Sequence, residues 1–69
     1  MALYDITIFL AGGATAKIKK PFKNQEAVLS YLEDQIKQDP FRADSETQTA
    51  VLIIKKPKDN IVGYLVDEV

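Results

Sequence analysis

The chain contains no cysteine, no histidine and no tryptophan. Without cysteine it forms no disulfide and no thiolate metal site, and this absence is typical of proteins from a reducing compartment. Without histidine it lacks the commonest general base of enzymes and the commonest metal ligand. We therefore expect a protein that is not an enzyme and that has no catalytic residue, no metal site and no cofactor.

Long apolar runs are also missing. Nothing approaches the ~20 consecutive apolar residues of a membrane-spanning helix. The apolar stretch 6–16 has no basic segment before it and is interrupted by Gly12 and Gly13, which excludes a signal peptide. Ten acidic and nine basic residues give a net charge of −1, so no overall field attracts nucleic acid or an anionic membrane. We expect a soluble, cytoplasmic protein with no membrane association and no evident small-molecule substrate.

The length of 69 residues and the 46% share of hydrophobic residues fit one small folded domain, residues 1–69. A second core has no chain left to form it, because most domains need ~100 residues or more. A chain of this size buries only roughly 60% of the surface that its unfolded form exposes. Its stability is therefore expected to be small unless association adds to it.

Two strands joined by a tight turn are predicted at the N-terminus. Residues 3–11 alternate between apolar and polar side chains, which is the pattern of a strand, although Phe9 falls on the polar side and suggests that this side is partly covered. The pair Gly12-Gly13 suits the turn of a hairpin. Residues 14–20 alternate again, with lysines on the outer side, and Pro21 is expected to end this strand.

A helix is predicted over residues 25–38. Asn24 is a suitable N-cap, and an apolar stripe recurs at helical spacing through Val28, Leu29, Leu32 and Ile36. Pro40 ends the helix, because the residue before a proline is disfavoured in the α region. Residues 41–46 then have the composition of a polar connection.

Residues 47–56 and 61–67 are rich in β-branched side chains and flank the turn 57–60, which predicts a second hairpin. The predicted fold class is therefore α+β in the order ββαββ. Its simplest form is a four-stranded antiparallel sheet with one helix packed across one face.

Other candidate sites are weak. The doublets Glu33-Asp34 and Asp67-Glu68 are neighbours in sequence, so their side chains point apart on a helix or strand and form no facing catalytic pair. The turn glycines lack the surroundings of a phosphate-binding loop. These residues are best interpreted as solvated charges and a hairpin turn.

The lysines are concentrated on strand ends and turns. They form the candidate nucleic-acid surface Lys17, Lys19, Lys20, Lys23, Lys55, Lys56 and Lys58. Such a cluster neutralises backbone phosphates, but lysines on exposed strands also block aggregation at sheet edges. The chain has one arginine, Arg42, so bidentate readout of bases has almost no donors. We favour edge protection over nucleic-acid binding.

Apolar residues on both sides of the last two predicted strands suggest a partner. One helix covers one face of a sheet, and a strand exposed on the other face should alternate rather than be apolar throughout. The candidate interface residues are Ile61, Val62, Tyr64 and Val66. The predicted function is a non-catalytic small interaction module that forms a homodimer or binds another protein through this face. The alternative is weak, non-sequence-specific binding of nucleic acid by the lysines.

Overall fold

A computed structural model describes residues 1–44 and 51–69. The N-terminal hairpin is confirmed: strands β1 (Ala2–Leu10) and β2 (Thr15–Phe22) pair antiparallel, and Gly12 and Gly13 both have a φ of 90° in the turn. The prediction that Pro21 ends the second strand is wrong, because it lies opposite Leu3 within β2. Since β2 is at the edge of its sheet, the missing N–H of a proline is tolerated there.

The predicted helix is confirmed as α1 (Gln25–Ile36). The Asn24 side chain accepts a hydrogen bond from the backbone N–H of Ala27 at 2.9 Å, which satisfies one of the unpaired donors of the first turn. Val28 and Leu32 are completely buried. The apolar stripe read from the sequence is therefore the side of α1 that faces the core.

Residues 41–46 were predicted as a polar connection. This is wrong for residues 41–44, and residues 45–46 lie outside the described residues. Strand β3 (Phe41–Asp44) alternates strictly between buried and exposed side chains and pairs antiparallel with β4 (Val51–Ile54). Two apolar and two polar residues in alternation are enough for a half-buried strand. Within the predicted strand 47–56, residues 51–54 form β4, and residues 47–50 lie outside the described residues.

The predicted second hairpin and the single four-stranded sheet are also wrong. In the described residues β4 pairs with β3, whereas β5 (Ile61–Glu68) pairs antiparallel with β1, giving a three-stranded sheet in the order β2-β1-β5 and a separate two-stranded sheet. The reason lies between β4 and β5. Lys56 adopts a left-handed conformation with a φ of 49°, and Pro57 starts a short second helix, α2 (Pro57–Asn60). A helical turn directs β5 away from β4, whereas a tight hairpin turn would return it.

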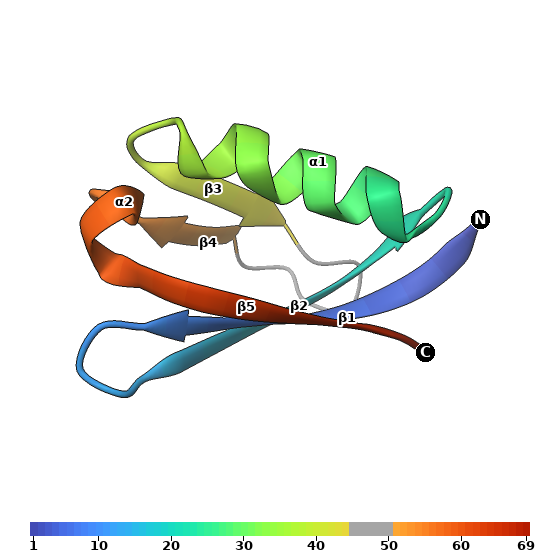
Figure 1. The fold of residues 1–69 in the computed structure, drawn as a ribbon, viewed down its shortest axis with the longest axis horizontal. Helices are drawn as coiled ribbons and strands as arrows, with labels where there is room; N and C mark the ends of the chain where they lie inside the picture. Colours follow the sequence, from blue (N-terminus) through green and yellow to red (C-terminus); the bar gives the residue numbers. More distant parts are fainter. Residues whose placement is uncertain (45–50) are drawn as a thin grey trace.

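The molecule has two layers (Figure 1). Helix α1 and the β3–β4 hairpin lie on the same side of the three-stranded sheet and together cover that side. The side chains of all three parts meet in one core, whose buried members are Tyr4, Ile6, Ile8, Ile18, Val28, Leu32, Phe41, Ala43 and Ile54. The α+β class is thus correct, but the cover consists of a helix and a hairpin instead of a helix alone.

A β-bulge in β5 sets which of its side chains face the core. Phe9 lies opposite Gly63, but the next residue, Leu10, lies opposite Ile61. Val62 is therefore an extra residue without a partner in β1. The bulge turns Ile61 to the same side as Tyr64, and both pack against the core.

No helix within residues 1–44 and 51–69 combines the length and the apolar character needed to cross a bilayer.

Candidate functional site

The side of the three-stranded sheet opposite α1 is covered by no element of the described chain (Figure 1). We call this side the open face. Strand pairing and the two-residue alternation of side chains assign residues to it. These are Leu3, Asp5, Thr7 and Phe9 of β1, Thr15, Lys17, Lys19 and Pro21 of β2, and Gly63, Leu65 and Asp67 of β5, with Val69 directly after the strand.

Several large apolar side chains on or beside the open face are exposed to solvent. Phe9 is 41% exposed, Leu65 is 51% exposed and Val69 is 64% exposed. Val69 extends the ladder, because its N–H donates to the Leu3 carbonyl at 2.9 Å. Val62, in the bulge beside Gly63, is 74% exposed. The apolar surface is therefore shared by the central strand and the β5 edge.

The charges of the open face are unevenly distributed across the strands. Lys19 on β2 and Asp5 on β1 form an ion pair of 3.6 Å, with 35% and 52% of their side-chain surfaces exposed. On its other side Asp5 lies directly opposite Asp67 of β5. Two carboxylates facing each other across a strand pair repel. The β2 edge of the face is thus basic and the β5 edge acidic.

The structure separates the four candidate interface residues. Ile61, Tyr64 and Val66 are half-buried and pack against the core on the covered side of the sheet. Val62 alone is on the surface. The sequence interpretation placed Val62, Tyr64 and Val66 on one face because they follow at intervals of two, and the bulge breaks that alternation.

Two residues of the open face were missed as site residues, namely Phe9 and Leu65. Phe9 has a signal in the sequence, because it occupies the polar side of an otherwise regular alternation in β1. The place of Leu65 on that same side follows only from its pairing opposite Thr7, which the structure shows. A large apolar residue on the polar side of a strand marks surface that is either covered or used for binding.

The seven candidate lysines do not form one surface. Lys17 and Lys19 lie on the open face, whereas Lys20 points to the covered side. Lys23 precedes the start of α1, while the Lys56 N–H donates to Asp39 beyond its end. A helix of this length separates these two positions by about 18 Å.

Lys20 joins the two sheets. Its ammonium lies 2.7 Å from the Asp44 carboxylate and 4.9 Å from the ring centroid of Tyr31. The hydrogen bond to Asp44 raises the pKa of Lys20 and lowers the pKa of Asp44. Lys20 is therefore engaged between β2, β3 and α1.

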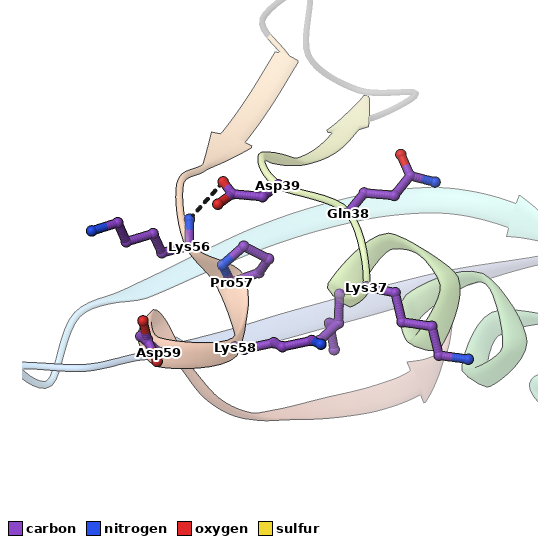
Figure 2. A pocket seen from close by; sticks show the side chains of 8 residues that line it. Lys37, Gln38, Asp39, Lys56, Pro57, Lys58 and Asp59 are labelled. Carbon is purple, nitrogen blue, oxygen red and sulfur yellow. Dashed lines mark hydrogen bonds between the residues drawn. The ribbon is translucent and has the colours of Figure 1, made fainter.

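Lys56 and Lys58 line an open pocket of 390 Å³ between the end of α1 and α2 (Figure 2). The backbone N–H of Lys56 donates to the Asp39 carboxylate at 2.9 Å, which fixes the two loops to each other. The Lys56 side chain points away from Lys58, and Asp59 adds a second carboxylate to the lining. The pocket has mixed charge and no convergent set of donors.

Within the described ranges, no group of three or more carboxylates is arranged to hold a metal ion. Tyr4 donates a hydrogen bond to the Glu68 carboxylate at 3.3 Å. Desolvation raises the pKa of Tyr4, and the negative charge of Glu68 adds to this effect. The hydroxyl therefore stays protonated and holds the end of β5 to β1.

Comparison with protein-family models, with curated proteins and with solved structures finds no match to this chain.

Proposed function

We propose that this protein is a non-catalytic interaction module that binds a protein through the open face of its three-stranded sheet. The observation that supports this most directly is the exposure of Phe9 and Leu65 on a face that no described element covers. Contiguous exposed apolar surface on a small protein usually marks an interaction site. Aromatic residues such as Phe9 are enriched in protein interfaces relative to the rest of the surface.

The rim of the open face also suits a protein partner. Lys17, Lys19, Asp5 and Asp67 combine both signs of charge beside the apolar residues. Protein interfaces typically have an apolar centre and a polar rim. A surface for nucleic acid would instead be basic throughout, because it neutralises phosphates.

The alternative function, binding of nucleic acid by the lysines, has less support. Two of the seven lysines share the open face with two aspartates, Lys20 is paired with Asp44, and the others lie near opposite ends of α1. A groove for single-stranded nucleic acid combines a continuous basic surface with stacking aromatic side chains.

Site-specific photo-crosslinking tests the proposed function. A photoreactive residue placed at position 65 lies on the open face, and one placed at position 34 lies on the exposed side of α1. In extracts of the cells that make the protein, position 65 is expected to form adducts with a defined protein, and position 34 is not.

Competition with unlabelled protein makes the test specific. Wild-type protein and the control Asp34→Lys should both abolish the adduct from position 65, whereas Phe9→Lys should not. Absence of protein adducts at position 65, equal labelling at both positions, or full competition by Phe9→Lys would each refute the proposal.

A further inference from the structure

The open face is organised in rows that run across its three strands. Lys19, Asp5 and Asp67 form one row, with the lysine on one edge and an aspartate on the other. The row Thr15, Phe9 and Gly63 has the aromatic side chain in the middle and a residue without a side chain beside it.

The charged row is incomplete within one chain. It holds two carboxylates and one ammonium, and the carboxylates of Asp5 and Asp67 lie on directly opposite residues. Lys19 approaches Asp5 at 3.6 Å from the β2 side, which is the far side from Asp67. A second cation above Asp67 would offset the repulsion between the two carboxylates.

A second copy of the chain, related by a two-fold axis parallel to the strands, supplies that cation. Rotation about this axis leaves each residue at the same height along the strands and exchanges the two edges of the sheet. Strand β2 of one copy therefore lies over β5 of the other. Lys19 then lies over Asp67 of the second copy, and Asp67 lies over Lys19 of the second copy. The central strand lies close to the axis, so Phe9 meets Phe9 of the second copy. Asp5 likewise approaches Asp5 of the second copy, and each of these carboxylates keeps the Lys19 of its own chain at 3.6 Å.

Resting on the proposed function, we infer that the partner of the open face is a second copy of this chain, packed face to face about a two-fold axis along the strands. Sheets that pack in this way lie about 10 Å apart with their strands rotated by roughly 30°. This distance leaves room for one layer of side chains from each copy. Gly63, beside Phe9, adds space for the two rings.

The size of the face indicates a weak dimer. The stretch from Leu3 to Phe9 spans about 20 Å and three strands span about 15 Å, so each copy offers about 300 Å² in projection. Standard interfaces bury ~800 Å² of accessible surface per partner. We expect association in the micromolar to submillimolar range, at which dimer and monomer exchange freely.

A pair of complementary charge reversals tests this inference. Lys19→Asp places like charges opposite each other twice in its homodimer, and Asp67→Lys does the same with the opposite sign. Each variant alone should self-associate about tenfold more weakly than wild type in low salt. An equimolar mixture should recover the affinity, because both contacts in the heterodimer join opposite charges.

Sedimentation equilibrium up to about 500 µM measures the affinities. Asp34→Lys changes the charge as Asp67→Lys does, but on α1, and should associate like wild type. Asp67→Lys should also fold at least as stably as wild type when dilute, because it replaces the repulsion with Asp5 by attraction. Its weakened association is therefore not a sign of misfolding.

A strictly monomeric wild type would overturn the inference, and so would a mixture that associates no better than the single variants. If position 65 still forms adducts with a different protein, the proposed function stands and only the identity of the partner is wrong. If position 65 forms no protein adduct in extracts or at the protein concentrations used for sedimentation, both proposals fail.

Discussion

Leu32→Ala tests whether α1 packs on the sheet as the structure shows. Leu32 is fully buried within the core between α1 and the two sheets. Truncation of a buried leucine costs about 2 to 5 kcal/mol, of which part is the cavity that remains. A domain of this size has a total stability of about 3 to 5 kcal/mol. The variant should therefore be close to its unfolding midpoint in water at room temperature.

Urea titration followed by far-ultraviolet circular dichroism measures this loss. With a slope of about 1 kcal/mol per molar urea, a loss of about 3 kcal/mol moves the midpoint down by about 3 M. Leu65→Ala removes the same atoms from a residue that is 51% exposed, and in dilute solution it should cost less than about 1 kcal/mol. A loss below about 1 kcal/mol for Leu32→Ala, or equal losses for both variants, would refute the packing of α1.

Two further predictions concern polar contacts. Asn24→Ala removes the acceptor for the Ala27 N–H and should cost about 1 kcal/mol in urea titration, whereas Asn24→Asp should retain most of the stability. Equal losses of stability in the two variants would contradict the capping role. The hydrogen bond to Lys20 lowers the pKa of Asp44. This contact therefore stabilises the folded state above the ordinary pKa of 3.8, and the stabilisation is lost as the pH falls through the lowered value. Asp44→Asn should therefore lose less stability than wild type between about pH 4 and pH 2, as measured by thermal unfolding, and parallel pH profiles would contradict this.

The first hairpin and α1 were predictable because their signals are local. The turn of the hairpin requires positive φ at two successive residues, which Gly12 and Gly13 supply. The start of α1 is fixed by the hydrogen bond to Asn24, and its buried side by the spacing of Val28 and Leu32. None of these features depends on a distant part of the chain.

The second half was mispredicted because its pairing is set by distant contacts. The pattern of β5 allows it to pair with any neighbouring strand, and what decides is the direction of the chain after Lys56 and Pro57. The Asn60 carbonyl then accepts a hydrogen bond from the Ala11 N–H at 2.7 Å, which places the start of β5 beside β1. A left-handed lysine has no signature in the sequence, since glycine or asparagine is usual at such positions.

The sequence indicated an apolar sheet face but not the residues that the structure exposes on it. The excess of apolar side chains indicated correctly that more apolar surface exists than one helix covers. The β3–β4 hairpin covers part of the sheet side on which Tyr64 lies, and the bulge at Val62 reassigns the sides of β5. A bulge is defined by the partner strand, so it cannot be read from β5 alone.

Both edges of the three-stranded sheet oppose the addition of a further strand, which favours the open face over the edges as the surface for the proposed partner. The β2 edge carries Lys17, Lys19 and Pro21, and lysine and proline are the residues that most often protect exposed edges. The β5 edge is interrupted by the bulge at Val62, and its far end carries acidic residues that would repel a second β5 close by. Edge pairing would also leave Phe9 in water. Face-to-face packing buries Phe9 and brings Lys19 into the contact, whereas edge pairing through β5 would leave Lys19 far from the contact. We therefore expect the charge of Lys19 to control association.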